Sequence, residues 1–188
     1  MRILSRLLFC LAFSTPAFAA PVAYVLEAER STVGFATDFG AQVITGRMPV
    51  TQANLTLDFD DVGNAQIDVV LDVSRATASF PFAAQTLKGD TVLDAQAYPT
   101  IRFISTRVRR DGQNANVQGD LTIRGVTKRV TLRATIYRPE GQAEGDNSHL
   151  TVQLVGAVNR SDFGAVGFAD MVADEVRLDI VARIVATP

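Results

Sequence analysis

Three consecutive runs of alternating apolar and polar side chains, between residues 98 and 138, constrain the fold of this chain more than any other feature. In the second run Val117, Leu121 and Ile123 alternate with polar residues. Successive side chains of a β-strand point to opposite faces of the sheet, so each run predicts a strand with one dry and one wet face. Turn sequences at Asp111-Gly112 and around Gly125 separate the runs. The stretch therefore predicts an antiparallel meander.

The same alternation recurs on both sides of this meander. Strands are expected over residues 22–26, 32–36, 42–50, 54–59, 66–73, 150–158 and 175–184. We expect the first two to form a hairpin that turns at residues 29–31, and Pro49 to end or bend the third. A total of eight to ten strands is typical of an up-and-down barrel or a large sandwich. Closure into a barrel would hide the sheet edges, and about eight strands would leave an interior with room for one small ligand.

The period changes between residues 79 and 97. Phe80, Ala83, Ala84 and Leu87 fall at helical spacing, and Pro81 occupies a position that a first helical turn tolerates. This pattern predicts a helix with an irregular extension. In a barrel a lone helix commonly lies across an opening, so the segment is a candidate lid. A surface helix with a structural role alone is an equally weighted alternative.

The first 19 residues have the three parts of a secretory signal peptide. Arg2 and Arg6 form a positive start, a short apolar run follows, and Ala17-Phe18-Ala19 has small residues where a signal peptidase reads. The apolar run is roughly half of the ~20 residues that a membrane-spanning helix needs. We expect export, cleavage after Ala19, and a single domain over residues 20–188.

Cleavage would also change the composition of the chain. It removes Cys10, the one cysteine of the sequence, and with it any thiol or disulfide chemistry. It takes two of the 18 Lys and Arg residues and none of the 20 Asp and Glu residues, which leaves a net charge of about −4. A mildly acidic surface without charge clusters gives no reason to expect nucleic acid or an anionic membrane as a partner.

Candidates for catalysis or metal binding are few. His149 is the sole histidine and follows the turn-rich stretch 139–148, where we expect it to be solvated. Without a second histidine or a mature cysteine, a transition-metal site of the usual ligand types cannot be assembled. No serine has a base at a plausible partner position. The carboxylate pairs Asp60-Asp61 and Asp68 with Asp72 fit a turn and a wet strand face. We therefore expect a protein that is not an enzyme, without catalytic residues, metal or cofactor.

Residues in and around the central meander resemble the signature of the YceI-like family. The resemblance is carried by Tyr98-Pro99-Thr100-Ile101, Phe103, Ser105-Thr106 and Gly119 to Lys128, and by Ser31 to Phe35, Gly46-Arg47, Ser74 with Thr77, Leu87-Lys88, Asp94 and Asn159 to Gly164. It covers almost the whole chain after residue 20. Members of this family are described as secreted bacterial proteins whose lipocalin-like barrel encloses a polyisoprenoid lipid. The resemblance thus implies an all-β, antiparallel up-and-down, lipocalin-like barrel of about eight strands with one helix or lid segment. It also implies a periplasmic location and that class of ligand.

The phenylalanines are candidates for the wall of such a cavity. The mature chain keeps eight of them and has no tryptophan. Phenyl groups suit a cavity without polar partners, although core packing is the more frequent role for any single one. For the phenylalanines taken together, the resemblance favours a role in the wall of a cavity. The expected ligand-binding residues are Phe35, Phe39, Phe59, Ile67, Val69, Leu71, Phe80, Phe82, Leu87, Leu93, Phe103, Leu121, Ile123, Phe163 and Phe168. Candidate contacts to a polar head group are Arg47, Lys88 and Arg160.

Three departures from the family pattern lie in or near the expected lid. Many members carry an Arg-Asp pair and a histidine just before the Leu-Lys, where this chain has Ala83-Ala84-Gln85-Thr86. Two aromatic residues usually follow, where this chain has Val92-Leu93. A His-Leu or His-Phe pair is replaced by Thr37-Asp38-Phe39. These changes affect the expected contacts to the polar end of the ligand and leave the apolar cavity as it is.

Together, the residues and the resemblance predict a periplasmic protein that sequesters or transports an isoprenoid-type lipid, such as a polyprenyl lipid or a quinone-like molecule. The alternative is a non-enzymatic interaction module that partners a membrane redox or stress-response protein and whose cavity is incidental. A monomer and a homodimer are both compatible with the sequence.

Overall fold

The computed structural model describes residues 21–143 and 145–187, so the predicted signal peptide, residues 1–19, lies outside the described residues. In the described part, most elements are strands, with short helices between some of them. The strand bounds are β1 Val22–Leu26, β2 Thr32–Phe39, β3 Gln42–Met48, β4 Val50–Leu57, β5 Gln66–Asp72, β6 Thr77–Ala78, β7 Thr100–Asp111, β8 Asn114–Ile123, β9 Val126–Tyr137, β10 His149–Asn159 and β11 Glu175–Ala186. The helices are η1 Ala28–Arg30, η2 Val62–Asn64, α1 Pro81–Lys88 and η3 Arg160–Phe163.

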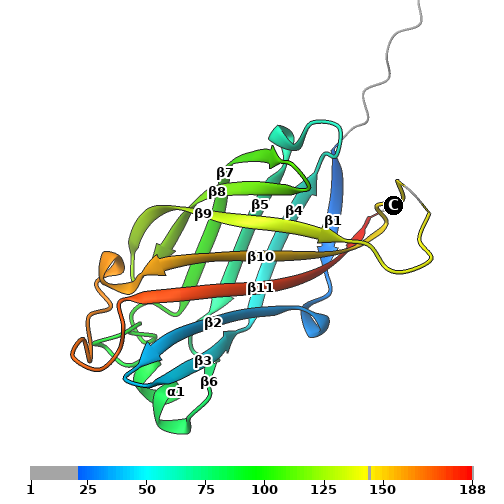
Figure 1. Ribbon diagram of the computed structural model, residues 1–188. Helices are drawn as coiled ribbons and strands as arrows, with labels where there is room; N and C mark the ends of the chain where they lie inside the picture. Colours follow the sequence, from blue (N-terminus) through cyan, green and yellow to red (C-terminus); the bar gives the residue numbers. More distant parts are fainter. Residues whose placement is uncertain (1–20, 144, 188) are drawn as a thin grey trace, which may run out of the picture.

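These segments form one sheet that closes on itself. Neighbours follow the order β1-β4-β5-β7-β8-β9-β10-β11-β2-β3-β6, and a further antiparallel pairing joins β1 to β11 (Figure 1). Three barrel strands are interrupted once each, because β1 and β2, β3 and β4, and β5 and β6 continue one another along shared neighbours. Counted this way, eight antiparallel strands follow one another around the barrel in chain order. The predicted up-and-down barrel of about eight strands is confirmed.

The predicted hairpin over residues 22–39 is wrong. β1 and β2 lie end to end along β11, with Tyr24 opposite Ala186 and Val33 opposite Ile180. The single 3₁₀ turn of η1 between them offsets the chain without reversing it, so both segments keep the same neighbour. The backbone N–H of Arg183 donates to the Ser31 hydroxyl over 3.0 Å and holds this interruption against β11. Pro49 interrupts the next barrel strand between β3 and β4, as expected.

A β-bulge in β7 reverses which residues face the interior. The pairing of β7 with β8 shifts register between Ser105 and Arg107. One extra residue inverts the period-two pattern. Phe103 therefore faces the interior before the bulge, and Val108 and Arg110 face it afterwards.

The two ends of the barrel differ. At the end that we call the helix end, α1 and the turns after it lie beside the loop 160–174 (Figure 1), and the N–H of Gly167 donates to the carbonyl of Thr91 over 2.8 Å. The helix predicted within residues 79–97 is confirmed as α1, which begins at Pro81 after the N-cap residue Phe80. The opposite end, the loop end, carries η1, η2, the β7–β8 turn and the loop 138–148 (Figure 1).

Fully buried side chains form three separate clusters around the interior. One is centred on Val73 and Phe163 near the helix end, another on Tyr24 and Ile184 near the loop end, and a third on Val117. Many other inward-facing residues are only half-buried. The interior is thus lined by apolar side chains without being filled by them. Among the described residues, no helix is long and apolar enough to cross a membrane.

Candidate functional site: the barrel lumen

A cavity of about 770 Å³ occupies the barrel interior, and we call it the lumen. It runs from Phe82 and Phe168 at the helix end to Arg110 and Arg138 at the loop end. Its wall is overwhelmingly apolar, because the inward faces of the strands supply Val, Leu, Ile and Phe side chains. This volume lies within the roughly 300–1,000 Å³ that is usual for small-molecule sites.

Two glycines keep the lumen open by giving phenyl rings a place to lie. A Cβ atom at Gly119 would stand 2.5 Å from Cε2 of Phe103, and one at Gly46 would stand 2.5 Å from Cε1 of Phe35. Each ring therefore covers a glycine of the neighbouring strand and lies against the wall. A larger residue at either glycine would force the ring away from the wall. The lumen depends on this pairing of small and large residues across adjacent strands.

The structure places every predicted apolar site residue on the wall of the lumen. They are Phe35, Phe39, Phe59, Ile67, Val69, Leu71, Phe80, Phe82, Leu87, Leu93, Phe103, Leu121, Ile123, Phe163 and Phe168. Their environments differ, because Phe163 is fully buried in the core near the helix end, whereas Phe82 is largely exposed at the mouth of the lumen. Their contact with a ligand stays a prediction.

The three predicted head-group cations have other environments. Arg47 is exposed on β3, on the opposite face from Ile44 and Met48, which line the lumen. The ammonium of Lys88 donates to the carbonyl of Ser74 over 3.3 Å, and Lys88 also lies outside the lumen. The structure therefore does not place either cation on the wall that a ligand would contact.

Arg160 reaches the lumen but holds the loop 160–174 together. Its Nε donates to Ala173 O, its Nη1 to Ala165 O and Gly167 O, and its Nη2 to Val172 O, over 2.5 to 3.0 Å. Four of its five N–H donors are thus used by backbone carbonyls. This guanidinium is a structural centre of the loop.

Sequence reasoning missed the two arginines that line the loop end, Arg110 and Arg138. Nη2 of Arg110 donates to Phe59 O over 2.9 Å, and Nη2 of Arg138 donates to the side-chain oxygen of Asn147 over 2.8 Å. Both keep further donors, since a guanidinium has five. The alternation of β9 could have identified Arg138, because it is the next inward-facing position after Ile136. Arg110 could not be found in this way, because the bulge reverses the alternation before it.

Asp58 is the one carboxylate on the wall of the lumen among the described residues, and it is buried. It accepts hydrogen bonds from the Asn64 amide, the Asp61 N–H and the Asp60 N–H, over 2.8 to 3.0 Å. These bonds, that from Asn64 first, hold the pKa of Asp58 below its usual range. A carboxylate held in this way is a weak base. Its evident role is to shape the turn between β4 and β5.

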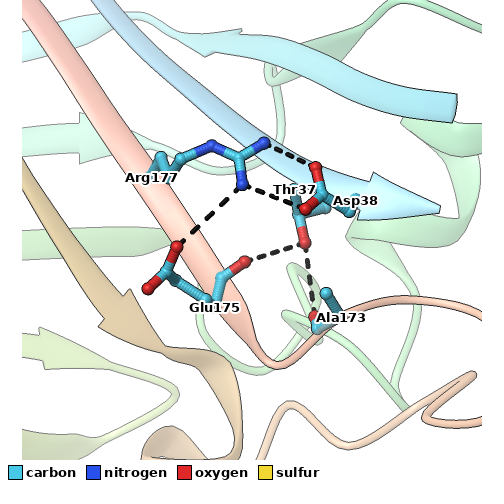
Figure 2. A network of polar contacts seen from close by, with 5 residues as sticks. All are labelled: Thr37, Asp38, Ala173, Glu175 and Arg177. Carbon is cyan, nitrogen blue, oxygen red and sulfur yellow. Dashed lines mark hydrogen bonds and ion pairs between the residues drawn. The ribbon is translucent and has the colours of Figure 1, made fainter. Parts of the chain in front are cut away.

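A polar network at the helix end fastens the loop 160–174 to β2 (Figure 2). The buried Thr37 hydroxyl lies 3.2 Å from Ala173 O and 3.0 Å from Glu175 O. Arg177 binds both carboxylate oxygens of Asp38, over 2.6 and 3.2 Å, and this pairing lowers the pKa of Asp38. The Asp38 carboxylate thus ties β2 to β11. The loop that borders the lumen is anchored by the Thr37 hydroxyl, by the Ala173 N–H, which donates to Asp38 O over 2.8 Å, and by the bridge between Phe39 and Val172.

The other candidates for chemistry do not converge on the lumen. In the residues that the structure describes, no group of three or more His, Cys, Asp or Glu side chains could hold a metal ion. His149 is exposed, and its Nδ1 lies 3.1 Å from the Ser148 hydroxyl, outside the lumen. On the wall itself, the Ser31 hydroxyl donates to Glu27 O. The lumen thus offers apolar surface with a few polar groups at its ends.

Comparison with known proteins relates this geometry to a family. A family model described as the YceI-like domain matches residues 24–184. The chain is 30% identical over 129 residues to a UPF0312 protein of Pseudomonas putida strain W619, covering 68% of this chain and 67% of that protein. It is 28% identical over 110 residues to Protein YceI of Escherichia coli O17:K52:H18, covering 57% of each.

Solved structures share the fold. Burkholderia cenocepacia BcnA superposes with a TM-score of 0.76 at 21% identity, covering 85% of this chain and 99% of that one. A polyisoprenoid binding domain from Saccharophagus degradans, implicated in plant cell wall breakdown, gives a TM-score of 0.63 at 15% identity, covering 88% and 99%. At these identities the similarity is one of architecture.

Proposed function

Since the chain belongs to the YceI-like family, we propose that it is a binding and carrier protein that takes the apolar tail of an isoprenoid-type lipid into its lumen. The observation that carries this proposal is the apolar cavity of about 770 Å³, which the interior side chains leave unfilled. An open hydrophobic cavity lowers the stability of a barrel unless something occupies it. The Saccharophagus degradans neighbour, which is named for polyisoprenoid binding, supports the same class of ligand.

Burial of the tail alone supplies a useful affinity. Transfer of about ten methylene equivalents from water at ~0.8 kcal/mol each contributes ~8 kcal/mol before the costs of association. Before those costs are subtracted, that free energy corresponds to a dissociation constant of about 1 μM, and each further methylene group adds to it. The proposed carrier therefore needs no tight clamp on the head group, which fits a wall with few polar residues.

The polar end of the ligand belongs at the loop end in this proposal. Arg110 and Arg138 line the lumen there together with the amides of Gln113 and Asn114. Both arginines are exposed, so a phosphate or a quinone oxygen beside them would stay hydrated while accepting their hydrogen bonds. At the helix end, by contrast, Arg160 is committed to backbone carbonyls.

We further propose that the protein acts in the periplasm and without catalysis. The positive start, apolar run and small residues of positions 1–19 support export. On the lumen wall, Asp58 is held by N–H donors, and the Ser31 and Thr37 hydroxyls bond backbone carbonyls. Such groups stabilise the barrel, and they do not form the nucleophile and base that covalent catalysis uses.

The test is a series of isoprenoid alcohols of increasing length: geraniol, farnesol and geranylgeraniol. Calorimetric titration should show affinity that rises with each added isoprene unit and levels off when the lumen is full. Leu121→Phe, which adds bulk to the lumen wall, should weaken the longest ligand most. Ile104→Phe, on the exposed outer face of β7, is the matched control and should leave binding unchanged. Affinity that is independent of chain length, or equal in both variants, would refute the proposal and favour an interaction module whose cavity is incidental.

A further inference from the structure

Large apolar side chains surround the mouth of the lumen at the helix end, and we call them the helix-end rim. The rim consists of Phe80, Phe82, Val166, Phe168 and Met171, all of them exposed. Phe82, on the first turn of α1, is 76% exposed, although phenylalanine is among the residues that are usually buried. A cluster of such residues marks a surface that contacts another apolar phase.

The fold holds the two halves of the rim together although they are distant in sequence. Gly167 N–H donates to Thr91 O over 2.8 Å, which joins the loop 160–174 to the turns that follow α1. Gly40 N–H donates to Met171 O over 3.2 Å, and the same loop is braced from within by Arg160. Phe168 has a φ of +60°, which is costly for a bulky residue. The fold therefore holds the rim residues in fixed positions at the helix end.

The rim is continuous with the lumen. Phe80, Phe82, Phe168 and Met171 are exposed to solvent and also line the cavity wall. Apolar side chains thus extend from the interior of the barrel to its outer edge. If the lumen receives a lipid tail, as proposed above, the rim faces the phase from which that tail comes.

The charges at the two ends point to the kind of surface that the rim contacts. Asp170 stands between Phe168 and Met171, and the cations of the helix end, Lys88 and Arg124, donate to the backbone carbonyls of Ser74 and of Asp90 and Val92. The arginines on the lumen wall with unused donors, Arg110 and Arg138, lie at the opposite end. Attraction to anionic lipids would need basic residues at the contact. Contact through this rim would instead depend on the burial of phenyl rings.

We propose that the helix-end rim docks the protein on the surface of a lipid bilayer. Phe82 and Phe168 insert among the acyl chains, and the mouth of the lumen faces the membrane. The membrane is then the source and destination of the proposed ligand, and the polar loop end faces water. Only the role of docking in ligand exchange rests on the proposed function. Insertion of the rings needs no bound ligand.

The experiment is flotation of delipidated protein with vesicles of pure phosphatidylcholine, at physiological and at high salt. The full-length mature protein should float with the vesicles, and the double variant Phe82→Ser with Phe168→Ser should bind at least about tenfold less, as expected from losing two partly inserted rings. Tyr137→Ser is the matched control, because Tyr137 is an aromatic residue 51% exposed near the loop end. It should bind like the wild type. Replacing a third of the phosphatidylcholine by phosphatidylglycerol should not strengthen binding.

Three results would overturn the proposal: no flotation of the wild type, equal flotation of the rim and control variants, or binding that requires phosphatidylglycerol and disappears at high salt. A stable dimer in solution that the rim variant converts to a monomer would also overturn it, because the rim would then contact a second copy. The titration with isoprenoid alcohols is independent of vesicles. A protein that binds farnesol and does not float would retain the proposed function and lose this inference.

Discussion

Replacement of Gly119 by alanine tests how the lumen is kept open. The new Cβ would stand 2.5 Å from Cε2 of Phe103 and 2.6 Å from the carbonyl oxygen of Ile104, distances that real Cβ atoms essentially never show. The phenyl ring must turn away from the wall, and it then enters the lumen. The carbonyl belongs to the backbone, so β7 and β8 must also move apart. Gly119→Ala should therefore both destabilise the barrel and weaken binding.

The magnitude follows from two opposing terms. Forcing a methyl group into a packed site costs about 1–3 kcal/mol. Replacing a strand glycine with alanine recovers roughly 0.5–1 kcal/mol, because the unfolded chain loses freedom. The expected net loss in the free energy of unfolding is about 0–2.5 kcal/mol, centred near 1 kcal/mol. In a protein of this size each kcal/mol lowers the melting temperature by about 2–4 °C.

Gly156→Ala is the matched control. Its Cβ would meet Cδ2 of Leu132 at 2.6 Å, but this atom is the end of a flexible side chain, and the nearest backbone atom lies at 3.3 Å. We expect its stability to be within about 0.5 kcal/mol of the wild type or above it. Urea denaturation gives the stabilities, and titration with geranylgeraniol gives the affinities.

A double-mutant cycle isolates the ring. Gly119→Ala should cost at least ~0.5 kcal/mol less in a Phe103→Leu background, since leucine removes the clash with the ring and leaves the clash with the backbone. If Gly119→Ala equals Gly156→Ala in stability and binds geranylgeraniol like the wild type, the explanation of the open lumen is wrong.

Three further predictions concern the polar residues on the wall of the lumen. The folded pKa of Asp58 lies below its unfolded value of about 3.9. The contribution of this carboxylate to stability is therefore complete above that pH and is lost as the pH falls toward the folded pKa. In acid titrations followed by circular dichroism, Asp58→Asn should lose less stability than the wild type between pH 5 and pH 2. Arg160→Gln should lower the free energy of unfolding by about 2–3 kcal/mol, because it leaves backbone carbonyls unpaired. Limited proteolysis of this variant should then cut within residues 164–173. A direct role of Arg160 in the head-group site would instead reduce ligand affinity without new cleavage. Arg110→Met with Arg138→Met should weaken farnesyl phosphate more than farnesol, and an equal effect on both ligands would contradict the placement of the polar end.

The barrel could be predicted from the sequence because its signals are local. Each strand of the meander carries its own alternation, and turn residues such as Gly112 and Gly125 adopt the positive φ that their turns need. The hairpin at residues 22–39 was wrong for a related reason. Turn-like residues at 29–31 form a single 3₁₀ turn, and only the pairing of both flanking segments with β11 shows that the chain continues in one direction.

The apolar wall of the site was predicted as a set, but the hollow within it could not be. In the sequence, a phenylalanine that faces the interior has the same pattern around it whether it packs in a core or lines a cavity. The difference lies in which residue stands beside it on the neighbouring strand, as with Phe103 and Gly119. The roles of the polar residues were harder to predict, because they too depend on the folded arrangement. Arg160 donates to four carbonyls that only the folded loop presents, and a bulge in β7 turns Arg110 inward.

The central claim, that an isoprenoid-type tail occupies the lumen, is tested most directly by native mass spectrometry of the protein purified from its own cells without detergent. The account predicts a bound mass that is released by organic solvent, that fragments in steps of one isoprene unit, and that is depleted in Leu121→Phe but not in Ile104→Phe. Protein that is repeatedly recovered at its bare polypeptide mass, with nothing in the solvent extract, would contradict it.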